Sequence, residues 1–297
     1  MQRPELLVGN PVHSLEKAVS SRLARCLALL LVFLPLLAEA QTKGIVTFAK
    51  LKDLEFINTY YDHGYGSLGT GPGPNYGLQF TANAQAIVSA SKGGSGNFIN
   101  DPNNYPVMFF QTGNNVTITA INGLQTALWF YYSALQTGAF TVYTGPNATG
   151  TILASITLPT NNSGCTTYKL CVWTPIGLPL SAPAGSISFA GVADYLAIAS
   201  IHMGSALPTS MVLTSSQNPS VQDEPVTFTA TVTATGTVAV GSVTFKAGPK
   251  VVGVVPLVNG VASVTVSSLK TGSTHISAKF QGAGFVNATQ GLTQVVN

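Results

Sequence analysis

The residues between positions 53 and 76 are the ones whose types and spacing could do chemistry. Asp53 and Glu55 stand two positions apart. In a β-strand this spacing places both carboxylates on one face, roughly 7 Å apart, which approaches the separation of the acid pair in a glycosidase. The pair therefore predicts an extracellular hydrolase as one alternative. We favour the other, two solvated residues at a strand edge, because no supporting motif accompanies the pair.

Metal binding is a weaker prediction from the same region. Carboxylate and backbone oxygens are the ligands that Ca²⁺ prefers, and Glu55 and Asp62 are the candidates in this sequence. Zinc chemistry is not expected, because the sequence has no H-E-x-x-H motif or histidine cluster. Apart from Ca²⁺, the sequence predicts no cofactor.

The segment GYGSLG, Gly64 to Gly69, has the G-x-G-x-x-G spacing of a dinucleotide-binding turn. Such a site needs a helix directly after the glycines and an acidic residue about 20 positions later. The residues that follow are Thr70-Gly71-Pro72-Gly73-Pro74, which cannot form the first turns of a helix, and no acidic residue lies at the required distance. The sequence therefore argues against a dinucleotide site.

The tyrosine- and glycine-rich loop at residues 60–77 has a second interpretation, as a carbohydrate-binding loop. Tyrosine rings can stack on sugars, and carboxylate, imidazole and amide groups can hydrogen-bond to their hydroxyls. The candidate ligand-binding residues are Tyr60, Tyr61, Asp62, His63, Tyr65, Asn75 and Tyr76. The structural alternative is that the glycines allow tight turns and the tyrosines fold back over the edge of a sandwich.

Residues 1–40 have the layout of a secretory signal peptide. Four basic residues precede or flank an apolar run from Cys26 to Leu37, and Ala38-Glu39-Ala40 follows as an A-x-A cleavage site. The run is about a dozen residues long, against the roughly 20 that span a bilayer. We therefore expect cleavage near Gln41, no membrane span afterwards, and a protein that is secreted or at the bacterial cell surface.

Charge and cysteine content narrow the partners and the compartment. Residues 1–40 hold four of the 13 Lys and Arg and three of the 10 Asp and Glu, so the remainder carries nine and seven, a net charge of +2. Its cations are dispersed, so nucleic-acid binding is not expected. Cys165 and Cys171 remain after cleavage, and an even pair in an exported chain predicts a disulfide bond.

The sequence predicts an all-β protein. From Thr209 onward apolar and polar residues alternate, as in Val226 to Thr233 and Thr274 to Phe280, which is typical of strands with one buried face. Asn259-Gly260, between two apolar segments, predicts a two-residue hairpin turn. About seven short strands in roughly 90 residues favour an immunoglobulin-like sandwich.

The C-terminal part also resembles a known family. The segments TSMVLTSSQNPSVQDEPVTFTATV, GSVTFKAG and VVPLVNGVASVTVSSLKTGSTHISAKF, within residues 209–297, are similar to the bacterial Ig-like domain of group 3. The resemblance implies an extracellular spacer or adhesion module that is not an enzyme.

Residues 41–205 are expected to form a first domain, a jelly-roll-like β-sandwich, followed by a linker at 206–208. Strand patterns occur at 115–120, 128–134, 140–145 and 151–159, and no stretch combines helical periodicity with helix caps. The segments KLKDLEFINTYYDHGYGS, VYTGPNATGTILASITLP and SISFAGVADYLAIASIHMGS resemble the β-sandwich of exported PEP-CTERM-type bacterial proteins.

These observations predict a secreted or cell-surface protein without catalytic activity. The first domain would contact an extracellular glycan or a surface protein, and the Ig-like domain would act as a spacer or adhesion module. A carbohydrate-binding protein that uses the loop at 60–77 and an extracellular hydrolase are the two alternatives. The sequence does not indicate an oligomeric state.

Overall fold

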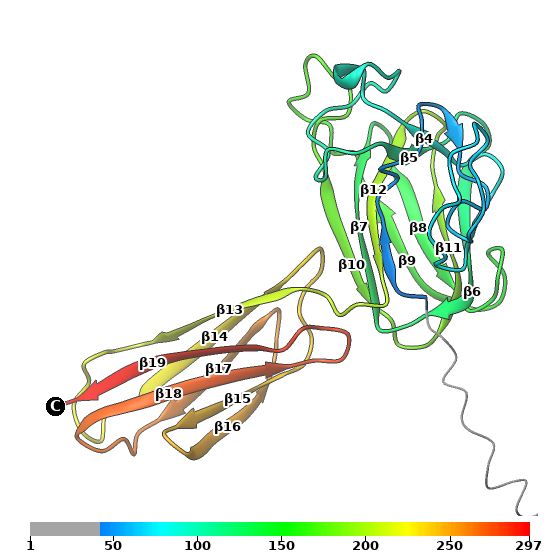
Figure 1. Ribbon diagram of the computed structural model, residues 1–297. Coiled ribbons are helices and arrows are strands. Elements are labelled where there is room, and N and C mark those ends of the chain that lie inside the picture. The colour runs from blue at the N-terminus through cyan, green and yellow to red at the C-terminus, as the bar shows by residue number, and fades with distance from the viewer. Residues whose placement is uncertain (1–41) are drawn as a thin grey trace, which may run out of the picture. The chain divides into compact units, whose positions relative to one another are not determined.

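A computed structural model describes residues 42–297, so the predicted signal peptide at 1–40 lies outside the described residues. The described part of the chain contains nineteen β-strands, one short 3-10 helix (η1, Ala90–Lys92) and no α-helix (Figure 1). The strands form four sheets, paired as two sandwiches. The predicted all-β fold is confirmed. Between residues 42 and 297, no helix is long and apolar enough to cross a bilayer.

The N-terminal sandwich consists of a seven-stranded and a five-stranded sheet. The seven-stranded sheet contains β10 (Thr174–Pro179), β7 (Ala127–Ala134), β12 (Leu196–Met203), β5 (Val107–Phe109), β4 (Gln85–Ile87) and β2 (Glu55–Phe56), with β1 (Gly44–Val46) also paired to β12. The five-stranded sheet contains β3 (Leu78–Phe80), β6 (Asn115–Leu124), β11 (Ala184–Ala190), β8 (Gly138–Tyr143) and β9 (Ile152–Leu158). All pairs between these strands are antiparallel.

This sandwich has the connectivity of a jelly roll. Strands β5 to β12 are arranged as β5-β12-β7-β10 in one sheet and β6-β11-β8-β9 in the other. Most steps along the chain therefore change sheet, as in two interlocked Greek keys. Strands β2, β3 and β4 extend the two sheets beyond these eight strands. The jelly-roll-like architecture predicted for this part of the chain is confirmed.

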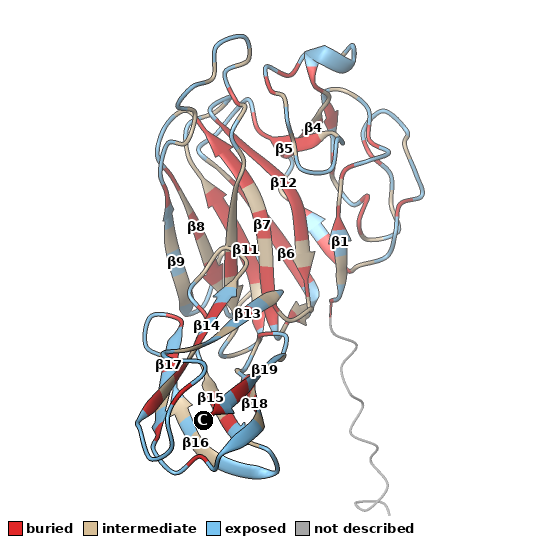
Figure 2. Cartoon of the chain, turned by 90° about the vertical axis from the view of Figure 1, so that its left-hand side faces the viewer, coloured by how far each residue is buried: buried red, intermediate tan, exposed pale blue. Residues whose placement is uncertain are grey.

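Aromatic side chains fill the space between the two sheets. Phe130 on β7, Phe140 on β8 and Phe189 on β11 have ring centroids 4.8 to 5.1 Å apart and are buried. Figure 2 shows the buried stretches of the sandwich in red, as along β7 and β12. Burial of one such ring typically contributes several kcal/mol, since removing it costs about 3 to 5 kcal/mol. Strand β7, whose residues from Leu128 to Tyr132 are apolar or aromatic on both faces, is an inner strand between β10 and β12.

The C-terminal sandwich consists of a three-stranded and a four-stranded sheet. The first contains β13 (Thr209–Ser215), β14 (Val226–Ala234) and β17 (Val261–Val266), and the second β16 (Lys250–Pro256), β15 (Ser242–Ala247), β18 (Gly272–Gln281) and β19 (Ala288–Val296). The predicted alternation is confirmed on β14, where Val226, Phe228, Ala230 and Val232 are buried. Phe228, Phe245 and Phe280 belong to the core of this sandwich.

The predicted turn at Asn259-Gly260 forms, but the two strands that it connects do not pair as a hairpin. Both residues have positive φ, 51° and 80°, and Val258 and Val261 exchange two backbone hydrogen bonds across the turn. Beyond that pair the strands separate, because β16 joins the four-stranded sheet and β17 the three-stranded sheet. The turn therefore carries the chain from one sheet of the sandwich to the other.

The linker predicted at 206–208 is tied to the C-terminal sandwich. Leu207 is fully buried in the core of that sandwich. Its N–H donates to the Gly284 carbonyl at 2.8 Å, and its carbonyl accepts the N–H of Val286 at 2.9 Å. Residue 207 is therefore held by packing and two backbone bonds, which sequence reasoning did not anticipate.

Candidate functional site

The glycine- and tyrosine-rich loop is an ordered excursion between β2 and β3. The N–H of Gly73 donates to Gly64 at 2.9 Å and that of Tyr76 to Tyr61 at 2.9 Å, so the two arms of the loop pair with each other. No helix follows Gly69, as expected from the prolines. A Cβ on Gly73 would lie 2.1 Å from the Tyr60 carbonyl oxygen, so the close approach of the arms requires glycine there.

Glu55 holds the tip of this loop from inside. Its Oε1 accepts the N–H groups of Leu68 (3.0 Å) and Thr70 (3.1 Å), and its Oε2 accepts the N–H of Lys52 (2.7 Å) and the Thr70 hydroxyl (2.7 Å). The side chain is 0% exposed. Burial works to raise the pKa of Glu55, but the hydrogen bonds from Lys52, Thr70 and Leu68 together outweigh it and hold the pKa below its usual value.

Asp53 also has a structural role, in a different place. Its Oδ1 accepts the N–H of Val88 at 2.8 Å and its Oδ2 accepts the N–H of Ser95 at 3.0 Å. The residue lies in a turn, and Leu54 beside it has a φ of 58°. The expectation that Asp53 and Glu55 share one face of a strand is therefore wrong, because the strand begins only at Glu55. The favoured expectation of two solvated edge residues is also wrong for Glu55, which is buried.

The two Ca²⁺ candidates have other partners. The four donors around Glu55 direct hydrogen atoms at its oxygens, where a cation would have to bind. Asp62 accepts the side-chain amide of Gln79 at 3.0 Å. Within residues 42–297 no three His, Cys, Asp or Glu side chains cluster in a way that suits a metal ion. Ca²⁺ binding stays a prediction that these contacts do not favour.

The tyrosines of the loop differ in exposure. Tyr60 and Tyr61 are 4% and 3% exposed, whereas Tyr65 is 55% exposed and Tyr76 is half-buried. The Tyr61 hydroxyl accepts the N–H of Phe48 at 2.9 Å, and its ring stacks on that of Tyr76 with centroids 6.0 Å apart. Burial raises the pKa of both Tyr60 and Tyr61. These two residues therefore fold over the core, and Tyr65 is the tyrosine of the loop with a free ring.

The remaining predicted ligand residues lie around the base of the loop. Asp62 and Asn75 face each other in an antiparallel bridge, and the Asn75 side chain accepts the N–H of Gly77 at 3.3 Å. His63 is exposed and has a φ of 58°. The ligand-binding role of the loop stays a prediction.

A hollow of about 380 Å³ lies beside the loop, and we call it the tyrosine hollow. Its walls include Tyr60, Tyr61 and Tyr76, together with Pro72 and Pro74. Lys50 is the charged residue in its lining. The structure therefore brings three of the predicted tyrosines to one cavity, although two of them, Tyr60 and Tyr61, are almost completely buried.

A larger cavity, about 440 Å³, lies elsewhere on the same sandwich. It opens where residues 88–106, between β4 and β5, and residues 159–173, between β9 and β10, cover part of the seven-stranded sheet; we call these segments the cover loops. Phe98 and Leu170 of the cover loops pack on Val107, Ala197 and Ala199 of the sheet. We call the hollow the cover-loop cavity.

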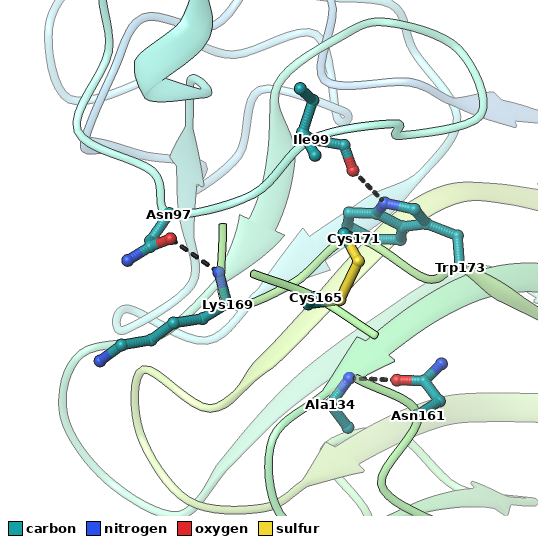
Figure 3. The surroundings of a disulfide bond; sticks show 8 residues. All are labelled: Asn97, Ile99, Ala134, Asn161, Cys165, Lys169, Cys171 and Trp173. Carbon is teal, nitrogen blue, oxygen red and sulfur yellow. Dashed lines mark hydrogen bonds between the residues drawn. A yellow bond between two sulfur atoms is a disulfide. The ribbon is translucent and has the colours of Figure 1, made fainter. Parts of the chain in front are cut away.

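The cover loops are fastened to each other (Figure 3). The predicted disulfide between Cys165 and Cys171 is confirmed, with the two Cα atoms 5.6 Å apart. Two residues between these cysteines bond to the other cover loop: the N–H of Lys169 donates to the Asn97 side chain at 2.8 Å, and the N–H of Leu170 donates to the Asn97 carbonyl at 3.2 Å. Trp173 adds a bond from its indole N–H to the Ile99 carbonyl at 3.0 Å.

Sequence reasoning missed the cover-loop cavity. Its lining comes from segments near Leu54, Ile87, Phe109, Leu135 and Tyr195 as well as from both cover loops. No motif connects these positions, and the pair Cys165 and Cys171 was the only signal in the sequence that marked one of its walls.

Comparisons with known proteins identify the C-terminal part of the chain. Residues 213–297 match the family model of the bacterial Ig-like domain (group 3). A search of curated proteins finds no match.

Similar solved structures include the glycoside hydrolase domain of Endo-D from Streptococcus pneumoniae R6 (10% identity, TM-score 0.26, 73% of this chain and 37% of that one). A second is a family 43 arabinoxylan arabinofuranohydrolase from Bacillus subtilis (14% identity, TM-score 0.29, 42% of this chain and 25% of that one). A third is a β-glycosidase from Bacteroides vulgatus (8% identity, TM-score 0.22, 62% of this chain and 26% of that one). The chain thus spans between a quarter and two fifths of these structures.

At these low identities and TM-scores, the similarity to the solved structures does not indicate the activity of this chain. The family match differs, because it covers all strands of the C-terminal sandwich except the start of β13. Residues 213–297 form a bacterial Ig-like domain of group 3.

Proposed function

We propose that the protein is a secreted or cell-surface binding protein without catalytic activity. In this proposal the N-terminal sandwich contacts an extracellular glycan or a surface protein, and the Ig-like domain acts as a spacer or adhesion module. The Ig-like domain supports the location, because such domains are typical of extracellular and surface proteins. The disulfide supports it as well, since disulfides persist in oxidising compartments.

The proposal that the protein has no catalytic activity rests on the hydrogen bonds that its carboxylates already accept. Seven Asp and Glu residues lie in the described part of the chain. Five of them accept hydrogen bonds that hold local structure, namely Asp53, Glu55, Asp62, Asp101 and Glu224. A general acid or base needs a proton-accepting oxygen directed at a substrate. Glu55, the central residue of the hydrolase alternative, is buried and has both oxygens engaged.

The test uses the chain from Gln41 onward, with glycan arrays and with whole bacterial cells from several phyla as surfaces. We expect retention on a defined subset of glycans or cells and no turnover across a panel of glycosides and esters. Turnover that survives repurification, and that is lost in Glu55→Gln while the variant stays folded by circular dichroism, would restore the hydrolase alternative. Absence of retention on every surface would contradict the proposal.

Carbohydrate binding through the loop at 60–77 is a second candidate, favoured by the tyrosine hollow. Tyr76→Ala removes a ring from its wall, and Tyr65→Ala removes the exposed ring of the loop. If this loop binds the glycan, either change should reduce glycan retention at least about fivefold, since a stacked aromatic ring contributes about 1 kcal/mol or more. Tyr105→Ala, which removes another exposed tyrosine outside the loop, is the matched control. Tyr61 is unsuitable because it is a core residue.

Unchanged retention in Tyr65→Ala and Tyr76→Ala would rule out this second candidate. It would leave the first proposal in place, because the contact would then lie elsewhere on the protein.

A further inference from the structure

We propose that the cover-loop cavity is a binding site for the end of a neutral glycan, one or two sugar residues long. This inference rests on the proposed binding function and names a ligand class and a site for it. The site is distinct from the loop at 60–77, because none of the residues of that loop lines this cavity.

The size of the cavity suits such a ligand. Small-molecule sites in proteins typically enclose about 300 to 1,000 Å³. The volume of about 440 Å³ lies at the small end of this range. It accommodates one or two sugar rings, whereas a longer oligosaccharide would have to extend out of the opening.

The walls are held in place before any ligand binds. Phe98 and Leu170 form a parallel bridge between the cover loops, and Ile99 donates its N–H to the Leu170 carbonyl at 3.0 Å. The base of the second cover loop is fixed by Asn161, whose side chain accepts the N–H of Ala134 at 2.7 Å and donates to the Tyr132 carbonyl at 3.1 Å. A preformed site loses less conformational entropy when it binds.

The lining divides into an apolar floor and a polar rim. Phe98, Phe109, Leu170 and Leu196 are buried and form the floor. The polar lining residues are Ser95, Asn97, Gln111, Lys169, Asp194 and Tyr195. Sugars have the same division, with C–H faces that pack on apolar surfaces and hydroxyls that donate and accept hydrogen bonds.

The rim of the cavity carries one positive and one negative side chain, and neither is paired within the described residues. Neither the Lys169 ammonium nor the Asp194 carboxylate has a hydrogen-bonding or ionic partner within residues 42–297. The hydroxyls of a neutral sugar can accept a hydrogen bond from Lys169 and donate one to Asp194, whereas an anionic ligand attracted to Lys169 would also be repelled by the Asp194 carboxylate. One charge of each sign therefore favours a neutral polyhydroxy ligand over a phosphate or a sugar acid. Tyr195, which is 37% exposed, adds an aromatic ring at the opening.

The experiment is an NMR titration of the uniformly ¹⁵N-labelled chain from Gln41 onward with neutral disaccharides: cellobiose, maltose, lactose, chitobiose, xylobiose and mannobiose. A ligand of this size in a suitable site reaches an affinity of about 1 mM or tighter, which chemical shifts detect. Glucuronate and leucine are the charged and zwitterionic comparison probes. We expect at least one disaccharide to shift the amides of Asn97, Lys169, Leu170 and Tyr195.

Two variants test the site itself. Asp194→Asn removes the charge at constant size, and Lys169→Gln removes it with a side chain one atom shorter. We expect each to weaken the binding about tenfold, as for loss of a charge-assisted hydrogen bond. Asp223→Asn and Lys279→Gln make the same chemical changes at exposed positions in the Ig-like domain and should leave binding unchanged.

Three outcomes would overturn the inference: no shift of the cavity amides with any neutral disaccharide, shifts that both variants leave unaltered, or tighter binding of glucuronate or leucine than of every disaccharide. Failure of this inference is separable from failure of the proposed function. Retention on glycans or cells that persists in Asp194→Asn and Lys169→Gln would overturn the cavity site alone, whereas absence of retention on every surface would overturn the proposed function.

Discussion

The carboxylate of Glu55 accepts both the backbone N–H of Thr70, at 3.1 Å, and the hydroxyl of Thr70, at 2.7 Å. This double contact joins a buried side chain at the start of β2 to a residue 15 positions later, in the loop of glycines and prolines. A Cβ at Gly66 would lie 2.3 Å from the same carboxylate, so glycine is required where the loop passes over it. Glu55 thus organises a loop that has no regular secondary structure of its own.

Glu55→Gln should destabilise the N-terminal sandwich by about 2 kcal/mol. Glutamine has one acceptor oxygen, so two of the four donors that face Glu55 would meet an amide N–H₂ group instead. Urea unfolding followed by tryptophan fluorescence measures this, because both tryptophans, Trp129 and Trp173, lie in the N-terminal sandwich. Asp223→Asn is the control, with an expected change within about 0.5 kcal/mol. An equally small change in Glu55→Gln would contradict the role assigned to the carboxylate.

The same carboxylate predicts a dependence of stability on pH. Because the pKa of Glu55 is lower in the folded state than its ordinary value of 4.5, the unfolded state binds a proton more readily. The stabilisation from Glu55 is therefore present above pH 4.5 and is lost as the pH falls below it. Thermal unfolding between pH 3 and 6 should show a smaller acid-induced loss for Glu55→Gln than for the wild type, and parallel curves would refute this.

Removing the disulfide should loosen the cover loops. In the chain-entropy model a loop of this length stabilises the fold by about 2 kcal/mol. In Cys165→Ser/Cys171→Ser we expect a loss of that size and faster hydrogen exchange at the amides of Ile99, Lys169 and Leu170, which bond across the loops. Exchange in the Ig-like domain should be unchanged and serves as the internal control. Equal protection of the three amides in both proteins would show that the disulfide does not fix the cavity wall.

Two glycines with positive φ in the Ig-like domain allow the energetic cost of backbone strain to be measured apart from that of a steric clash. A Cβ at Gly248 (φ 56°) has nothing within 4 Å, whereas one at Gly260 (φ 80°) would lie 2.8 Å from the Val232 carbonyl oxygen. We expect Gly248→Ala to cost about 1 kcal/mol and Gly260→Ala about 2 to 3 kcal/mol. Far-UV circular dichroism must follow the unfolding, since the domain has no tryptophan or tyrosine. A larger cost at Gly248 would contradict the geometry of the turn.

Local features of the fold were predictable from the sequence, and features that depend on distant segments were not. The alternation in Val226 to Val232 and the turn at Asn259-Gly260 follow from side-chain periodicity and backbone preference, and both are present. Which sheet each strand joins is a tertiary property, so the separation of β16 from β17 was not visible.

The candidate sites show the same division. The tyrosines of the loop and the two cysteines were identified from residue type and spacing, and the structure places three of the tyrosines around one hollow. The burial of Glu55 was missed because its partners lie up to 15 residues away and are mostly backbone N–H groups, which any residue can supply. The cover-loop cavity was missed because its walls meet through contacts such as Asn97 with Lys169, 72 residues apart.

His202 should titrate well below the usual range of histidine. Burial lowers its pKa to about 4, and its ring stacks on Trp129 with centroids 3.5 Å apart. The unfolded state, with a pKa near 6.5, takes up a proton first, so stability should begin to fall as the pH drops below about 6.5. Between pH 6.5 and 5 carboxylates of ordinary pKa stay ionised, so a pH-dependent loss in this window that His202→Gln abolishes would support the assignment. An imidazole signal of His202 that titrates near pH 6.5 would refute it.

The most direct test of the central claim, that the N-terminal sandwich makes the contact and performs no chemistry, is a single NMR experiment. The ¹⁵N-labelled chain from Gln41 onward is titrated with each glycan on which the protein is retained, and the NMR signals of the sugar are followed in the same sample. We predict shift changes confined to residues 42–203 and a sugar spectrum that does not change with time. Shift changes confined to residues 209–297, or the appearance of cleaved sugar, would contradict the account.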